Sequence, residues 1–220
     1  SLGNVIAPEK IIKTLGADIL RLWIASTDYR GDITCSENFF NRTADTYRRI
    51  RNTLRYLLAN TCDFNPQQDK IANDDLLALD RYMLLQASEM QKQVLKAYDE
   101  YQFHVVCQSI HHFCSVTLGG FYLDVIKDRI YTMQKDSIAR RSAQTVMFEM
   151  LESLTRCLAP ILSFTADEVW QYLPQREQDS VFLSQWYQHL PTQAANSVDA
   201  DFWQNVLGLR EMVNKSIEQA

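Results

Sequence analysis

The stretch that decides the fold lies between residues 138 and 158 and reads IARRSAQTVMFEMLESLTRCL. Apolar residues recur along it every three or four positions, at Ala139, Ala143, Val146 or Met147, Met150 and Leu154. This spacing places them on one side of an α-helix, which has ~3.6 residues per turn. Pro160 follows, and it lacks the backbone N–H that a continuing helix needs. The stretch therefore predicts a long helix that buries one face.

The same helical periodicity runs through most of the chain. It predicts long helices over residues 36–61, 75–101 and 103–118, and shorter ones over residues 8–15, 17–26, 165–173 and 199–219. No group of strand-length alternations lines up, so the predicted fold class is all-α. Four long helices with short connections predict an antiparallel helical bundle.

Local signals refine this prediction at several connections. Thr34 and Thr165 each precede a glutamate by three residues, which is the spacing of a capping box at a helix start. Gly119-Gly120 either kinks the chain after residue 118 or allows another backbone to approach closely. The segment 175–198 is polar and irregular, and only residues 181–183 suggest extended structure.

The helix predicted over residues 36–61 combines an apolar stripe with five arginines. Its stripe consists of Phe39, Thr43, Ile50, Leu54 and Leu57. At 100° per residue, Arg48, Arg51 and Arg55 fall within about 60° of one another and about 100° from the centre of the stripe. Arg42 and Arg49 lie on the far side of the same helix, so we do not expect all five arginines to serve one surface.

Composition limits the classes of protein to consider. The chain has 220 residues, of which 46% are hydrophobic and 22% charged, with only 6 Gly and 5 Pro. These values exclude collagen-like, low-complexity and disordered chains. No apolar run approaches the ~20 residues that span a membrane, and residues 1–10 show no secretory signal. Because the sequence starts at Ser1 and stops within a helical pattern, we expect a piece of a longer protein.

The charge of the chain is distributed unevenly. The formal net charge is −5, yet residues 41–60 carry +4 and residues 127–141 carry +3, while residues 142–220 carry −6. The two basic segments are either ordinary solvated helix faces or a surface for a polyanion. The common motifs for nucleotide binding, zinc proteolysis and serine hydrolysis do not occur. The residues therefore favour binding over catalysis.

Cysteine and histidine give no strong sign of a metal site. The five cysteines are scattered and form no CxxC pair, which favours a reducing compartment. His104, Cys107, His111 and Cys114 share one predicted helix, but the outer two lie about 15 Å apart along it. Only Cys107 and His111 are near enough to share an ion, and a third ligand is lacking. We therefore expect no metal and a structural role for these side chains.

Several stretches together resemble the bacterial isoleucyl-tRNA synthetases, a family of class I aminoacyl-tRNA synthetases. They are residues 1–6 (SLGNVI), 16–23 (GADILRLW), 28–32 (DYRGD), 47–53 (YRRIRNT), 118–129 (LGGFYLDVIKDR), 140–145 (RRSAQT) and 159–168 (APILSFTADE). The resemblance covers the whole chain in the order and spacing of the family. The second stretch is shared with the valine and leucine enzymes, whereas DYRGD and FYLDVIKDR resemble the isoleucine enzymes in particular.

The resemblance implies an all-α bundle of the class I synthetase anticodon-binding type. It implies that residues 1–33 are the end of the KMSKS loop and linker helices that contact the tRNA stem. Residues 34–174 would form the anticodon-binding bundle, and residues 175–220 an extended tail and the start of a C-terminal helical region. Ser1 resembles the final serine of the KMSKS signature, whose loop helps to hold ATP.

The intact family member joins isoleucine to its tRNA with ATP and Mg²⁺, and the family implies a structural zinc. The sequence lacks the HIGH-containing nucleotide-binding fold, the editing domain and the zinc-binding region. The resemblance implies a cytoplasmic, monomeric protein, and we expect its catalytic and C-terminal domains to lie outside this chain. In this chain we expect no catalytic residue, cofactor or metal.

The implied partner is tRNA(Ile), whose anticodon is a single-stranded loop on a phosphate-rich stem. Arginine suits it because a guanidinium pairs with phosphate and stacks on bases. The expected RNA contacts are Arg48, Arg51, Arg55, Lys127, Arg129, Arg140 and Arg141. For the last four, ion pairs within the protein are the alternative. The other functions left open are the same domain of a valyl- or leucyl-tRNA synthetase and a helical protein–protein interaction module.

Overall fold

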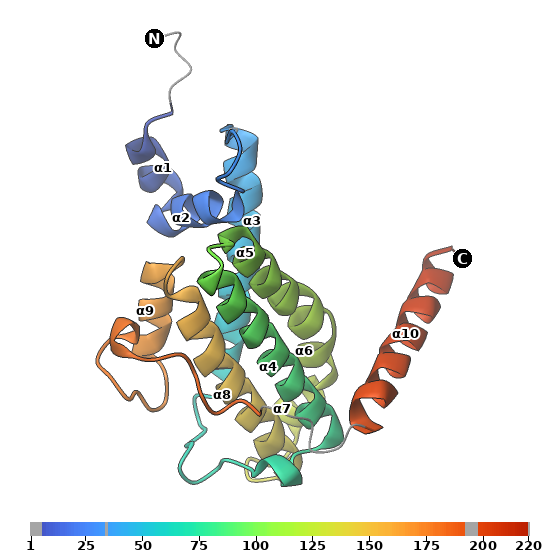
Figure 1. Cartoon of the computed structure of the whole chain (residues 1–220). Coiled ribbons are helices and arrows are strands. Elements are labelled where there is room, and N and C mark those ends of the chain that lie inside the picture. Colours follow the sequence, from blue (N-terminus) through green and yellow to red (C-terminus); the bar gives the residue numbers. More distant parts are fainter. Residues whose placement is uncertain (1–5, 34, 192–197, 220) are drawn as a thin grey trace.

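The computed structural model describes residues 6–33, 35–191 and 198–219, without the side chains of residues 198–200. Within these ranges the regular structure is helical, and no strand occurs. The all-α prediction is confirmed. Figure 1 shows long helices packed side by side, with α1 and α2 at one end of the bundle and α10 beside it. No helix in the described part of the chain is both long and apolar enough to cross a membrane.

The bundle is built around α8 (Ile138–Leu158), which has the bounds that its sequence predicts. It packs against α4 (Ala78–Asp99) and α3 (Glu37–Asn60), and α5 (Phe103–His112) packs against α4 and α3 in turn. Every residue of α8 from Arg141 to Leu158 is buried, including those opposite the predicted apolar face. The polar face of α8 is therefore an interior surface, which its amphipathic pattern does not indicate.

The chain continues beyond α5 in a widened helix. The predicted end at residue 118 is wrong: a π-helical segment, η2 (Phe113–Tyr122), leads into α6 (Leu123–Val125) and α7 (Lys127–Thr132). A π-helix bonds each carbonyl to the N–H five residues later, which makes the turns wider. A Cβ at Gly119 would lie 3.2 Å from the carbonyl oxygen of Cys114, five residues earlier. Here Gly119 allows close approach of the preceding turn.

Two short helices are attached to the bundle through α2 (Ala17–Ser26), which follows α1 (Pro8–Leu15) after Gly16 at φ 94°. The Asp18 carboxylate accepts bonds from the backbone N–H and Oγ1 of Thr165, at 2.7 and 2.6 Å. Arg21 donates to the carbonyl oxygens of Pro160 and Ile161, each at 2.8 Å. One turn of α2 thus binds both sides of the connection between α8 and α9 (Ser163–Gln171).

These contacts correct the predicted capping boxes. Thr165 lies inside α9, whose N-terminal N–H groups are bound by Asp18 from another helix. At the start of α3 the N-cap residue is Ser36, whose side chain forms no capping bond, and Thr34 lies outside the described residues. Local spacing is misleading at Thr165 because a carboxylate distant in sequence takes the capping position.

The N-terminal part of the predicted stripe on α3 is also wrong. Phe40 and Ala44 are buried there, while Phe39 is exposed and Thr43 half-buried. The reason is a change of partner: this end of α3 projects past the bundle and packs on α2 (Figure 1), where the rings of Phe40 and Trp23 lie 4.9 Å apart. Ile50, Leu54 and Leu57 face the bundle as predicted.

The segment after α9, residues 172–191, lies along the bundle without long regular elements, and we call it the strap. The expected extended residues form a turn of 3₁₀ helix, η3 (Val181–Leu183), with Val181 buried. Gln91 of α4 donates to the carbonyl oxygen of Tyr187 at 2.8 Å, and the Tyr187 hydroxyl donates to Glu149 of α8 at 2.7 Å. The strap therefore covers part of the polar face of α8. Beyond it, α10 (Val198–Gln219) contacts α4.

Replacing Asp18 tests its capping role. We expect Asp18→Ala to lower the free energy of unfolding by about 1–2 kcal/mol, because the N-terminal N–H groups of α9 lose their acceptor. Urea denaturation measures the change. The matched control is Asp28→Ala, at a more exposed aspartate paired with Arg30, where we expect a change within about 0.5 kcal/mol. Equal stability of the two variants would contradict the capping role.

Candidate nucleic-acid interface

The side of α3 that faces away from the bundle is rich in arginine. Arg42, Arg48, Arg49 and Arg55 are exposed, and at 100° per residue they fall within an arc of about 140°. Asn38, Asn41 and Asn52 are exposed on the same arc, and its one acidic residue beyond the first turn is Asp45. We call these eight residues the α3 outer face. It offers guanidinium and amide groups, which bind phosphate and base edges.

The three arginines predicted to act together differ in their surroundings. Arg48 pairs with Asp45 one turn earlier, and both side chains are exposed. Arg51 is half-buried at the edge of the outer face, where it lies 3.6 Å from Glu168 of α9. Arg55 is exposed and forms no ion pair with any described residue. Because exposed ion pairs contribute little free energy, an incoming phosphate can replace the carboxylate at Arg48.

Arg42 and Arg49, which the helical wheel sets apart, also face solvent. Neither forms an ion pair within the described part of the chain. The bundle covers the opposite arc of α3, through residues such as Ile50, Leu54 and Leu57. Both groups of arginines therefore lie on one open side of the helix, at its two edges.

Lys127 lies at the start of α7, on the surface. Its Nζ is 2.5 Å from the Asp124 carboxylate, and both side chains are exposed. This hydrogen bond lowers the pKa of Asp124 and raises that of Lys127. Lys127 is accessible to a polyanion, although it already has a local partner.

Arg129 instead enters the protein interior. Its guanidinium donates two bonds to Asp80 of α4, at 2.8 and 3.1 Å, and Asp80 is fully buried. Tyr122 and Ser142 donate hydroxyl bonds to the same carboxylate, at 2.8 and 2.6 Å. Burial, followed by the Asp80 charge, raises the pKa of Tyr122 well above its ordinary value. Arg129 thus joins α4, α7 and α8.

Arg140 forms a similar link with the loop after α3. It donates two bonds to the Asp63 carboxylate, at 2.8 and 3.1 Å, and another to the carbonyl oxygen of Ile130 at 3.2 Å. Gln144 donates to the same carboxylate at 2.7 Å. The bonds from Arg140 are the main reason why the pKa of Asp63 lies below its ordinary value.

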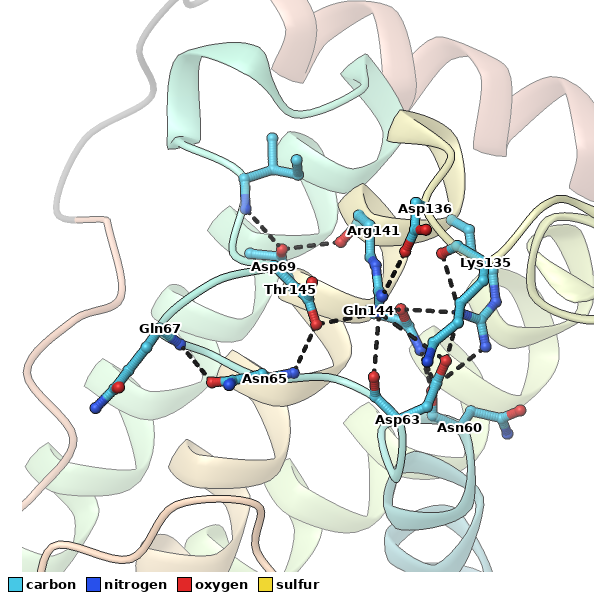
Figure 2. Close-up of polar contacts among 12 residues, drawn as sticks. Asn60, Asp63, Asn65, Gln67, Asp69, Lys135, Asp136, Arg141, Gln144 and Thr145 are labelled. Atoms are coloured by element: carbon cyan, nitrogen blue, oxygen red, sulfur yellow. Dashed lines mark hydrogen bonds and ion pairs between the residues drawn. The ribbon is translucent and has the colours of Figure 1, made fainter.

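Arg141 is enclosed more completely, with 7% of its side chain exposed. It pairs with Asp136 at 3.0 Å and with Asp69 at 3.4 Å, and it donates to Gln144 at 2.9 Å. Figure 2 shows these groups meeting where the loop after α3 crosses the start of α8. The guanidinium groups of Arg129, Arg140 and Arg141 are therefore held by carboxylates of the protein.

The structure divides the expected RNA contacts into two sets. Arg48, Arg51, Arg55 and Lys127 are accessible, and the other three arginines connect helices. Sequence reasoning had no signal for the partners Asp63 and Asp80, because they lie tens of residues from the arginines that they bind. Ser1 lies outside the described residues.

The side chains weighed for a metal site, His104, Cys107, His111 and Cys114, lie on α5 and η2. No group of three or more histidine, cysteine, aspartate or glutamate residues that could hold an ion occurs among the described residues. Burial raises the pKa of the Cys107 thiol to about 11 and that of Cys114 to about 12, so both stay protonated near neutral pH. These thiols fill the core.

Two known protein families match this chain. The family described as the anticodon-binding domain of tRNA ligase matches residues 80–220. The chain belongs to this family. A second family, the class I tRNA synthetases for isoleucine, leucine, methionine and valine, matches residues 1–36.

Curated relatives confirm the resemblance to the isoleucyl-tRNA synthetases. The chain is 53% identical over 219 residues to the isoleucine–tRNA ligase of Methylococcus capsulatus. This match covers 99% of this chain and 23% of that protein. It is 52% identical over 221 residues to that of Shewanella putrefaciens, covering 100% of this chain and 24% of the relative. The chain thus spans about a quarter of the length of these relatives.

A solved structure supports the fold. LeuRS of Agrobacterium radiobacter K84, in a ternary complex with tRNA and LeuAMS, superposes with a TM-score of 0.61 at 17% identity. The match covers 90% of this chain and 22% of that protein. At this identity the likeness shows a shared helical architecture. Together with the two family matches, it confirms the bundle of the class I synthetase type.

Substitution by methionine should distinguish the arginines that connect helices from those that are accessible on α3, by the effect on stability. We expect Arg129→Met to lower the free energy of unfolding by about 3–5 kcal/mol, because Asp80 would keep a buried charge without its partner. The matched control Arg55→Met removes an exposed, unpaired guanidinium and should change stability by about 0.5 kcal/mol or less. Urea titration measures both. A small effect at Arg129 would mean that its ion pair is dispensable.

The lowered pKa of Asp63 predicts a pH dependence of stability. Its ionised form is favoured in the folded protein, so its contribution is present above the unfolded pKa of about 3.9 and is lost as the pH falls through the folded value. We expect Asp63→Asn to be less stable than the parent at pH 7. The difference should shrink as the pH falls below about 4. Urea midpoints across pH 2–7 measure it, and a constant difference would exclude this linkage.

Proposed function

We propose that this chain serves as the tRNA-binding region of a protein that joins isoleucine to tRNA(Ile) with ATP. The observation that carries the proposal is the 52–53% identity to isoleucine–tRNA ligases over the whole chain. Membership of the anticodon-binding family supports the tRNA partner. The same identity favours isoleucine over valine or leucine, and it favours RNA binding over a general protein–protein module.

The α3 outer face is the proposed contact surface, with Arg51 at its edge and Lys127 as a further contact. Arginine can bond two oxygens of one phosphate and can stack on an unpaired base, so a row of arginines suits a stem that opens into a loop. From Arg42 to Arg55 the row extends about 20 Å along the helix, which is long enough to meet several phosphates. The asparagines between them offer both donors and acceptors to base edges.

We assign Arg129, Arg140 and Arg141 an indirect part in binding. Their pairs with Asp80, Asp63 and Asp136 hold α7, α8 and the loop after α3 in place. Through the bundle they position α3. Substituting them would alter RNA binding through stability and geometry, without removing a phosphate contact.

The ATP, Mg²⁺ and zinc of the whole protein would bind outside the described residues. ATP with Mg²⁺ would act in a catalytic domain outside the described residues, and we assign Ser1 to the end of its KMSKS loop. The zinc implied by the family has no ligand set among the described residues, so we place it elsewhere in the polypeptide. We propose residues 1–33, 34–174 and 175–220 as the three parts of the chain, in a monomeric cytoplasmic protein that also carries catalytic and C-terminal domains.

Charge reversal on α3 tests the contact surface. We expect Arg48→Glu, Arg51→Glu and Arg55→Glu each to weaken tRNA(Ile) binding by the full-length protein, because each loses a phosphate contact. Each should also reduce the slope of log affinity against log salt by about 0.7–0.9. Filter binding from 50 to 300 mM salt measures both quantities.

The control is Arg176→Glu, at an exposed arginine in the strap, far along the chain from α3. It makes the same charge change and should leave the salt slope unaltered. Unchanged affinity and slope in all three α3 variants would exclude these arginines as contacts. Stronger binding of tRNA(Val) or tRNA(Leu) than of tRNA(Ile) would instead overturn the assignment to isoleucine.

A further inference from the structure

A second basic group lies at the edge of α3 that borders α5. Thr53 of α3 donates to the carbonyl oxygen of Cys114 at 3.4 Å, which fixes the register of the two segments. Arg49 lies one turn before Thr53, and His111 lies about one turn before Cys114. The register therefore brings Arg49 and His111 together at the surface.

The charges around His111 are positive. Burial lowers its pKa first, and the charges of Arg49 on α3 and His112 on α5 lower it further. No carboxylate on α2, α3, α4 or η2, the other elements packed on α5, is among the groups that shift it. Asp28 interacts with His104, two turns before His111, and is paired with Arg30.

Arg49 itself is exposed and forms no ion pair with the described residues. Arg49 is the first-listed charge that acts on His111, and the carboxylate of Asp45, one turn before Arg49, pairs with Arg48. An exposed guanidinium beside an imidazole, with no carboxylate between them, is an unfavourable arrangement for the protein alone. It becomes favourable when an anion lies between the two groups. Arg42 lies about 20° from Arg49 and two turns earlier on α3, but it shares a pocket with Asp28 and Asp32, so the basic site is limited to Arg49 and His111.

We propose that Arg49 and His111 together bind a backbone phosphate of the tRNA and that His111 takes up a proton from solvent when they do so. This inference rests on the proposed function and adds a second contact line, along the α3–α5 edge, to the α3 outer face. In the free protein burial, and next the charge of Arg49, lower the pKa of His111 and so favour the neutral imidazole. The bound phosphate offsets that charge, and the protonated imidazole donates a hydrogen bond to a phosphate oxygen.

An RNA phosphate fits this site better than an acidic protein surface. The asparagines of the outer face continue from it, and they can contact sugar and base groups of the same strand. Proton uptake gives the site a property that a simple arginine contact lacks. Affinity for tRNA should rise as the pH falls through the range in which imidazole titrates.

The test measures tRNA(Ile) affinity of the full-length protein at constant salt between pH 8 and pH 6. We expect affinity to rise about fivefold to tenfold towards pH 6, because the bound state holds one more proton over much of this range. His111→Gln should abolish most of that rise while keeping binding at pH 8. His112→Gln is the matched control, at the exposed neighbouring histidine, and should retain the rise.

A second measurement does not depend on the RNA. In the free protein the His111 pKa, followed by NMR of the imidazole, should lie below 6.5 and should increase in Arg49→Gln. Arg49→Gln should also weaken tRNA binding and flatten its pH dependence. An unshifted His111 pKa in that variant would overturn the proposed pairing.

The outcomes separate this inference from the proposed function. Normal tRNA binding that does not vary with pH, or that varies equally in His111→Gln, would overturn the inference and leave the proposed function standing. Failure to bind any tRNA would overturn both. Binding of acidic polypeptides at this edge, with tRNA unaffected by Arg49→Gln, would exclude RNA as its ligand.

Discussion

The enclosure of α8 is the constraint on which the rest of the structure depends. A helix buried around its whole circumference must satisfy every polar side chain it carries, because an unpaired buried polar group costs about 1–3 kcal/mol. Ser142 therefore bonds Asp80, Gln144 bonds Asp63, Ser153 bonds Gln91 and Glu149 bonds Tyr187. Each of these bonds fixes a neighbouring element in position: α4, the loop after α3 or the strap.

This constraint explains why two basic segments of similar composition have different environments. The arginines of residues 127–141 lie where α7 and the start of α8 meet buried carboxylates, so they neutralise charge within the protein. The arginines of α3 lie on a helix that contacts the bundle along one side only. Their positive charge stays at the surface of a chain whose formal net charge is −5. Such a local field attracts a polyanion that the whole molecule would repel.

The sequence predicts the helices well wherever periodicity alone decides them. The bounds of α2 and α8 agree with the prediction to the residue, and α3 starts and ends within about one residue of it. The prediction is wrong where a residue distant in the sequence determines the contact. Asp18 does so at the start of α9, and Trp23 does so beside Phe40. The π-helical turns after His112 are similar, since their wide geometry depends on contacts between turns that pattern does not reveal.

The candidate interface could be predicted only in part for the same reason. Helical geometry gives the angles among Arg48, Arg51 and Arg55, but not which arc of α3 the bundle covers. The burial of Ile50, Leu54 and Leu57 supplies that information and leaves both arginine groups open to solvent. Arg51 links this surface to the rest of the fold, because its partner Glu168 lies on α9, which Asp18 of α2 caps. A contact at the start of α2 is thereby connected to the edge of the α3 outer face through one short helix, in addition to the direct packing of α2 on α3.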